Sequence, residues 1–172
     1  DPRFDNQPAR AGMHQENLVS KFLVRKVAVL GAGVMGAQIA AHLANAGVQP
    51  VLFELAADGR DRNANVKKAI EGLAKLEPSP LATKGVAERI TPANYDEHLA
   101  LLAGCDLVIE AIAERMDWKH DLYAKIAPFI APHAILASNT SGLSITTLSD
   151  GLPDALKPRF CGIHFFNPPR YM

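Results

Sequence analysis

The chain has 172 residues, 48% of them hydrophobic and 21% charged, and its formal net charge at pH 7 is zero. This length and composition are typical of a single globular domain with a substantial core. Because no run of Lys and Arg exceeds a pair, the charge pattern excludes an electrostatic grip on nucleic acid or on an anionic membrane surface.

The sequence shows neither a secretory signal nor an apolar run long enough to span a membrane. The two cysteines, Cys105 and Cys161, lie in or beside apolar segments, which favours free thiols and predicts a cytoplasmic location. Residues 1–20 are polar and lack periodicity, so we expect a disordered leader or an expression remnant there, followed by one domain over residues 21–172.

The most informative stretch covers residues 26–40, KVAVLGAGVMGAQIA. An apolar strand pattern changes abruptly at Gly31, Gly33 and Gly36 into a helix pattern that continues to Ala46. In such a strand-turn-helix unit the first glycine permits the turn, the second lets backbone approach a pyrophosphate, and the third lets helix and strand pack closely. Unpaired N–H groups at the helix N-terminus then face the phosphates, so the stretch predicts a dinucleotide site.

A second apolar run, over residues 51–53, ends in Glu54. This residue follows Gly33 by about 20 positions, the spacing of a carboxylate that binds the adenosine ribose hydroxyls. A carboxylate there repels a 2′-phosphate, so the predicted cofactor is NAD rather than NADP. The alternative is that Glu54 only ends a strand in solvent.

Along the rest of the chain, apolar strand patterns alternate with helix patterns. Strands are expected over residues 50–53, 105–113, 134–138 and 159–165, with a short edge strand near 88–91; helices are expected over residues 63–76, 96–102, 117–127 and 145–148. We therefore predict an α/β fold of the Rossmann type, with a doubly wound, mainly parallel sheet of six to eight strands in the order 3-2-1-4-5-6.

In such a sheet, ligands bind beyond the carboxyl ends of the strands. Of the six histidines, only His164 ends a predicted strand at that edge, within the run GIHFFNPP. A neutral imidazole there could take the hydroxyl proton of an alcohol while hydride leaves the same carbon for a nicotinamide, which makes His164 the candidate general base. The alternative is a core histidine with satisfied hydrogen bonds.

Three further polar residues are expected near this edge of the sheet. Ser141 follows the strand over residues 134–138, where its hydroxyl could bind a substrate oxygen, orient the histidine, or cap the next helix. Glu114 follows the strand over residues 105–113, and Lys119 lies on the next helix. Their spacing is compatible with a cofactor contact and equally with a solvated ion pair.

Four motifs together resemble those of the L-3-hydroxyacyl-CoA dehydrogenases, the NAD-dependent enzymes of fatty-acid β-oxidation. They are VLGAGVMGAQIA at residues 29–40, EAIAE at 110–114, ASNTSGL at 137–143 and GIHFFNP at 162–168. The resemblance implies that His164 is the catalytic base and that Ser141 orients the substrate and the histidine. It also implies that the chain is the NAD-binding part of an enzyme that oxidises the 3-hydroxyl of an acyl-CoA to a ketone.

The motifs and the resemblance together imply a set of cofactor contacts along the sheet edge. They are Gly31, Ala32, Gly33, Val34, Met35, Gly36, Glu54, Ala111, Ile112, Glu114, Lys119, Asn139 and Asn167. The resemblance further places CoA contacts on the helix over residues 63–76, where Lys67, Lys68 and Lys75 are the candidates. No metal site is predicted.

The sequence departs from the family pattern at three points. Glu54 stands where the family more often has Asp, and Gly142 replaces a commoner second Ser. The glutamate that the family pairs with its histidine, and the helical C-terminal domain that completes the acyl pocket and the dimer interface, do not occur before Met172. We therefore expect the chain to act with a helical domain of the same polypeptide, with a homodimer as one expectation for the full-length protein.

Two other interpretations stay open at this point. The chain could be a stand-alone NAD-binding module without turnover, or part of a Rossmann dehydrogenase for another hydroxy acid. The second interpretation leaves the run around His164 unexplained.

Overall fold

The computed structural model describes residues 22–172, so the leader predicted for residues 1–20 lies outside the described residues. The strands are β1 (Lys26–Leu30), β2 (Gln49–Glu54), β3 (Thr91–Asn94), β4 (Leu107–Glu110), β5 (Ile135–Ser138) and β6 (Phe160–Gly162). All pair in parallel in the order β3-β2-β1-β4-β5-β6. The predicted doubly wound fold and strand order are therefore confirmed, with six strands in the described part of the chain.

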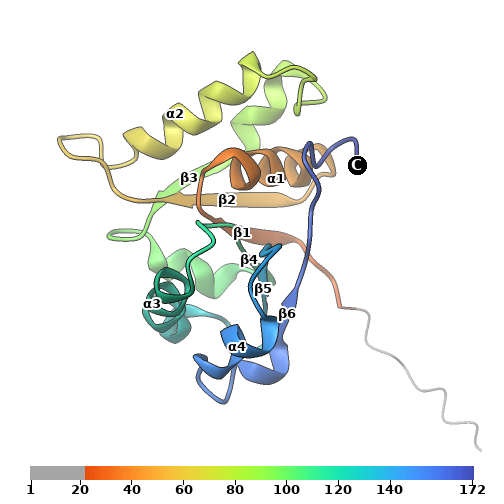
Figure 1. Cartoon of the computed structure of the whole chain (residues 1–172). Coiled ribbons are helices and arrows are strands. Elements are labelled where there is room, and N and C mark those ends of the chain that lie inside the picture. Colours follow the sequence, from red (N-terminus) through yellow and green to blue (C-terminus); the bar gives the residue numbers. More distant parts are fainter. Residues whose placement is uncertain (1–21) are drawn as a thin grey trace, which may run out of the picture.

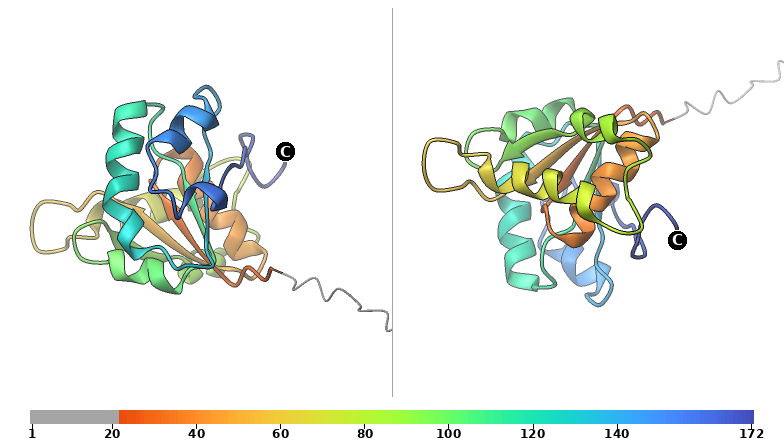
Figure 2. Two further views of the ribbon diagram at one scale, coloured as in Figure 1. Left: turned by 90° about the horizontal axis from the view of Figure 1, so that it is seen from below. Right: turned by 90° about the horizontal axis from the view of Figure 1, so that it is seen from above.

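Helices cover both faces of this sheet. They are α1 (Val34–Asn45), α2 (Ala64–Gly72), α3 (Met116–Ile126) and α4 (Ile145–Asp150). Short 3-10 segments occur at Leu73–Lys75, Lys84–Arg89, Leu99–Gly104, Ala127–Phe129 and Lys157–Arg159. Figure 1 shows α1 and α2 on one side of the sheet and α3 and α4 on the other, and the views in Figure 2 look onto these two layers in turn.

The strands alternate their buried side chains between two hydrophobic clusters, because successive residues of a strand point to opposite faces. On β1, Val27 and Val29 join the cluster under α1 and α2, whereas Ala28 and Leu30 join the cluster under α3 and α4. Both faces are covered, which explains why β1 is apolar from Val27 to Leu30. Within the described part of the chain, none of the helices has both the length and the apolar character that crossing a bilayer requires.

The structure differs from the sequence-based prediction mainly between residues 81 and 104. The edge strand lies at β3, three residues after the predicted position, and the segment before it is a 3-10 turn. Pro92 lies inside β3, which an edge strand tolerates because one of its sides needs no hydrogen-bond donors. The helix predicted over residues 96–102 is a 3-10 segment, Leu99–Gly104.

The predicted strands over residues 105–113 and 159–165 are shorter in the structure than in the prediction, because the backbone hydrogen bonding between strands stops near the carboxyl edge of the sheet. β4 ends at Glu110, although Ala111 still donates its N–H to the carbonyl of Leu30 at 2.8 Å. After β6, Ile163 donates to the carbonyl of Ser138 at 2.9 Å, but Phe165 donates instead to the side-chain oxygen of Asn139, also at 2.9 Å. The chain leaves the sheet where side chains replace backbone as hydrogen-bond acceptors.

Candidate active site at the carboxyl edge of the sheet

The glycine-rich turn between β1 and α1 has the shape that a pyrophosphate needs. Gly31 has φ +100°, and a Cβ there would lie 2.9 Å from the carbonyl oxygen of Ala111, so both backbone conformation and space require glycine. A Cβ on Gly36 would lie 1.7 Å from the carbonyl oxygen of Gly31. A Cβ on Gly33, by contrast, would meet nothing within 4 Å, so this glycine presents bare backbone to open space. The residues present therefore fit a dinucleotide.

The first turn of α1 carries no competing group. Gly33 is the N-cap, no side chain caps the helix, and no acidic residue occurs in its first turn. The first backbone N–H groups of the helix, whose positive dipole end they form, are left for an anion. Val34, at the start of α1, is exposed beside them.

Glu54 points at this turn from the end of β2. One carboxylate oxygen accepts the N–H of Ala32 at 2.8 Å, and the other accepts that of Leu55 at 2.8 Å. Glu54 lines a cavity of about 500 Å³ together with Gly31, Gly33 and residues of α3. The carboxylate is thus half-buried and held next to the glycine turn, and its contact with a ribose stays a prediction.

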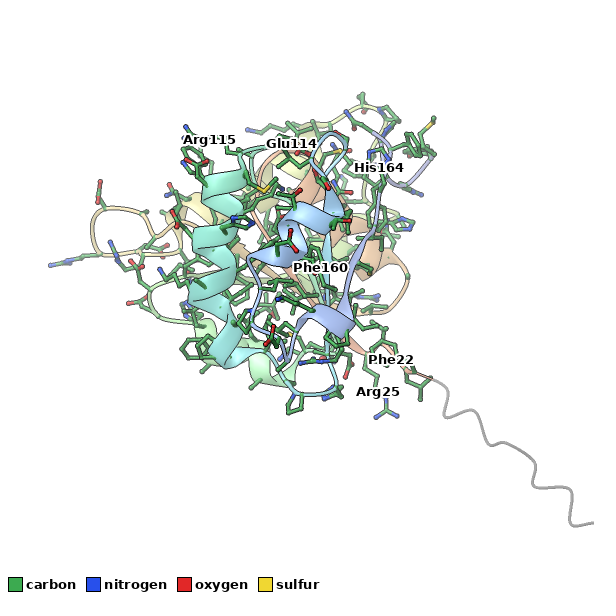
Figure 3. The ribbon with its side chains drawn as sticks, turned by 60° about the horizontal axis from the view of Figure 1, so that its bottom comes forward. Phe22, Arg25, Glu114, Arg115, Phe160 and His164 are labelled. Carbon is green, nitrogen blue, oxygen red and sulfur yellow. The ribbon has the colours of Figure 1, made fainter. Side chains whose placement is uncertain are left out.

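A second cavity of about 400 Å³ lies beside the first and contains the predicted catalytic residues. It is lined by Met35, Glu114, Asn139, Ser141, His164 and Asn167, among others. Residues 111–113 line both cavities, so they form a common wall between them. Figure 3 shows His164 and Glu114 at the same end of the molecule, opposite the end that carries Phe22 and Arg25.

Hydrogen bonds at both sides hold the segment that carries His164. The Asn139 side chain accepts the N–H of Phe165 at 2.9 Å, and Gln38 on α1 donates to the side-chain oxygen of Asn167 at 3.4 Å. The imidazole of His164 packs edge-on against the ring of Phe166, with centroids 4.8 Å apart. His164 is exposed and faces the cavity, so the interpretation as a core histidine is wrong.

Glu114 is fixed by the loop after β5. Its carboxylate accepts the Thr140 hydroxyl at 2.6 Å and the Ser141 N–H at 2.9 Å. Partial burial on its own would raise the pKa of Glu114, but these hydrogen bonds and the positive charges of Lys119 and His164 lower the pKa overall. Glu114 is therefore an anion at neutral pH, with His164 close enough to influence it.

The hydroxyl of Ser141 is not the helix cap that the sequence left open. The cap of α4 is Ser144, whose side chain accepts the N–H of Thr147 at 3.3 Å. Ser141 is exposed and lines the cavity with His164. Its hydroxyl is therefore available to a ligand.

Lys119 is not in a solvated ion pair. Its ammonium lies 2.6 Å from the carboxylate of Glu110, and the two side chains are 1% and 0% exposed. The same carboxylate also accepts hydrogen bonds from Tyr123 at 2.8 Å, Ser138 at 2.7 Å and the N–H of Ile112 at 2.8 Å. Lys119 lies behind the wall of the cavity, so its predicted contact with the cofactor stays a prediction.

Sequence reasoning did not assign a role to Glu110, although it lies in one of the motifs. A charged residue at the end of an apolar strand signals either solvent or a buried partner, and the partner here comes from nine residues further along the chain. The network around Glu110 ties β4, α3 and β5 together at the edge where the site lies.

The candidate CoA residues form no part of either cavity. Lys67, Lys68 and Lys75 are exposed on and after α2, and Lys67 pairs with Asp61 at 2.8 Å. Their predicted role stays a prediction.

Comparison with known proteins points to one family. The family described as "3-hydroxyacyl-CoA dehydrogenase, NAD binding domain" matches residues 26–172. A putative fatty acid oxidation complex trifunctional enzyme of Rickettsia felis is 48% identical over 150 residues, which are 87% of this chain and 21% of that protein. A probable 3-hydroxyacyl-CoA dehydrogenase of Deinococcus radiodurans is 41% identical over 150 residues, 87% of this chain and 43% of that protein.

A crystal structure of 3-hydroxybutyryl-CoA dehydrogenase from Escherichia coli K12 superimposes with a TM-score of 0.71 at 33% sequence identity, covering 87% of this chain and 31% of that chain. The chain thus spans between about a fifth and less than half of the length of these relatives. The glycine turn, the histidine segment and the family match over residues 26–172 lead to one conclusion: the chain belongs to the 3-hydroxyacyl-CoA dehydrogenase family, as its NAD-binding domain.

Proposed function

We propose that this chain is the cofactor-binding part of an enzyme that oxidises the 3-hydroxyl of (S)-3-hydroxyacyl-CoA to a ketone, with NAD as oxidant, in fatty-acid β-oxidation. The observation that carries the proposal is the shared wall of residues 111–113. It joins a cavity built for a dinucleotide to a cavity that contains His164, Ser141 and Glu114. This arrangement supports a reaction in which hydride passes to a bound dinucleotide while a base takes a proton.

The side chains of the second cavity suit alcohol oxidation. NAD, when bound, supplies the acceptor for the hydride that leaves C3 of the substrate. The imidazole of His164 takes the proton of the 3-hydroxyl as the C–O bond becomes a carbonyl, so the alcohol loses one proton and one hydride in total. The Ser141 hydroxyl donates a hydrogen bond to the substrate oxygen, and the negative charge of Glu114 stabilises the imidazolium that forms.

The two alternatives each leave an observation unexplained. A Rossmann dehydrogenase for another hydroxy acid leaves the run around His164 and the family match over residues 26–172 unexplained. A stand-alone module without turnover has no use for a base and a hydroxyl in one cavity. The acyl-CoA substrate is therefore the better fit.

The relatives are longer than this chain, and one is named as trifunctional. We infer that a helical domain of the same polypeptide covers the exposed side of the cavity and that the full-length protein forms a homodimer. The cytoplasm suits the two cysteines, which are both free thiols.

The proposal can be tested with the 172-residue chain. We expect it to bind NADH with micromolar-scale affinity but to reduce acetoacetyl-CoA poorly, because the glutamate partner of the histidine and half of the acyl pocket belong to the rest of the polypeptide. In the complete enzyme, His164→Gln should lower turnover at least about 100-fold, the usual contribution of a general base. Its NADH affinity and Tm should not change, because the side chain is exposed.

A matched control is His133→Gln, an exposed histidine that contacts Asp106 just before β4, at the opposite edge of the sheet. It should leave turnover unchanged. The proposal fails if calorimetry detects no NADH binding to the chain, or if the His164→Gln variant of the complete enzyme turns over as fast as the unchanged enzyme.

A further inference from the structure

One wall of the dinucleotide cavity contains residues that are not among the predicted cofactor contacts. Besides the glycine turn and Glu54, its lining includes Leu55 after β2 and Trp118 on α3. Leu55 is 68% exposed and Trp118 is 50% exposed, and neither belongs to the two hydrophobic clusters of the fold. Two large apolar side chains are thus left in water at one cavity, which marks a place where an apolar or aromatic group binds.

The indole of Trp118 is held in place from one side. The guanidinium of Arg115 lies 4.5 Å from the ring centroid, and Asp117 in turn binds that guanidinium through two hydrogen bonds, at 2.6 and 3.1 Å. Trp118 lines the cavity and Arg115 does not, so the guanidinium covers the ring without filling the space beside it. Figure 3 shows Arg115 at the end of α3, next to Glu114.

The position of Trp118 relative to Glu54 decides which part of a dinucleotide it meets. Gly31 and Gly33 fix the pyrophosphate, and Glu54 fixes the ribose next to it, so the adenine must lie beyond Glu54 and away from His164. Leu55 follows Glu54 directly, and both Leu55 and Trp118 line this cavity but not the cavity that contains His164. We propose that Trp118 stacks against the adenine ring of the bound dinucleotide, so that this chain positions its cofactor by an aromatic wall on α3.

This inference rests on the proposed binding of NAD. Stacking on an aromatic ring is favourable for any adenine nucleotide, and CoA also contains an adenine. Glu54 separates the two sources, because its carboxylate accepts ribose hydroxyls and repels the extra phosphate that CoA carries on its ribose. We therefore assign the Trp118 wall to the adenine of NAD.

The test uses the intrinsic fluorescence of Trp118, which is the single tryptophan of the chain. ADP-ribose is the probe, because it carries the adenine but lacks the reduced nicotinamide, which would absorb tryptophan emission. We expect saturable quenching of Trp118 by ADP-ribose, with the same Kd that calorimetry gives. Coenzyme A should give no quenching at the same concentrations.

The matched variants are Trp118→Leu and Trp118→Phe. Trp118→Leu should raise the Kd for ADP-ribose about tenfold, which corresponds to about 1.4 kcal/mol, a typical value for one base stacked on an aromatic side chain. Trp118→Phe should retain most of the affinity, and neither variant should change the Tm by more than a degree or two, since half of the side chain is exposed.

The outcomes separate the two proposals. If ADP-ribose binds by calorimetry but leaves Trp118 fluorescence and the Trp118→Leu affinity unchanged, the adenine wall is refuted while NAD binding stands. Quenching by coenzyme A alone would assign the wall to the substrate and also refutes the inference. If neither NADH nor ADP-ribose binds, the proposed function and the inference fail together.

Discussion

Gly36 and Gly33 should respond differently to substitution by alanine: Gly36→Ala should lower the stability of the fold, and Gly33→Ala should lower the affinity for NADH. In Gly36→Ala the new Cβ would lie 1.7 Å from the carbonyl oxygen of Gly31, and 3.0 Å is a limit that real Cβ contacts essentially never cross. The shortfall is 3.0 − 1.7 = 1.3 Å, and both partners are backbone, so either α1 or the glycine turn must move.

Overpacking of this kind costs about 3 kcal/mol when no flexible side chain can yield. The higher helix propensity of alanine returns about 1 kcal/mol, which leaves a net loss of about 2 kcal/mol. For a chain of this length, that loss lowers the Tm by about 4–8 °C. Calorimetric melting is the assay.

In Gly33→Ala the new Cβ meets no protein atom within 4 Å, and the residue already has an ordinary φ of −69°. The free energy of unfolding should fall by less than about 1 kcal/mol, the cost of alanine at an N-cap. The Cβ enters the space that a pyrophosphate needs, so the NADH Kd should rise at least about tenfold. A Gly36→Ala protein that melts like the unchanged chain, or a Gly33→Ala protein with unchanged NADH affinity, would refute this reading of the turn.

Three further outcomes are expected. Lys119→Met should lower the free energy of unfolding by about 3–5 kcal/mol in a urea melt, because it leaves the carboxylate of Glu110 buried without its cation. The double variant Glu110→Gln/Lys119→Met should recover part of this loss. A double variant no more stable than Lys119→Met would contradict the prediction. Hydrogen bonds from the N–H of Arg25, the ring of His133 and the N–H of Lys26 lower the pKa of Asp106 to about 2. The contribution of Asp106 to stability is therefore complete above its ordinary pKa and is lost as the pH falls through about 2. Asp106→Asn should flatten the Tm-against-pH curve below about pH 4, and a variant with the same fall of Tm in acid as the unchanged chain would contradict this prediction. Glu54→Gln should weaken NADH binding and narrow the preference for NADH over NADPH in calorimetry, because it removes the charge that repels a 2′-phosphate; an unchanged ratio of the two Kd values would show that Glu54 does not select the cofactor.

Local sequence patterns were sufficient to predict β1, the glycine turn and α1, and the strand order predicted which edge of the sheet carries the candidate site residues. The strand, turn and helix around Gly31 are specified by residues next to one another, so their prediction is confirmed. The grouping of Ser141 and His164 followed from topology, because the carboxyl ends of neighbouring parallel strands must meet. Residues 81–104 offered no such periodicity, and the structure forms 3-10 segments there on either side of β3.

The buried ion pair could not be predicted from the sequence in the same way. Lys119 looks like a surface residue on an amphipathic helix until Glu110, Tyr123 and Ser138 are brought around it from three different elements. The sequence of α3 alone does not predict that Lys119 packs against a carboxylate at the end of β4. Contacts of this kind depend on the packed structure, and the Trp118 wall belongs to the same class.

The common wall of residues 111–113 separates two cavities that are lined largely by different elements. On one side, the turn after β1, the end of β2 and α3 line the dinucleotide cavity, and on the other, the start of α1 and the segments after β4, β5 and β6 line the cavity that contains His164. Only a three-residue strip is common to both. Residues that line only the His164 cavity can therefore change without altering the glycine turn or Glu54, whereas any change within the strip alters the walls of both cavities.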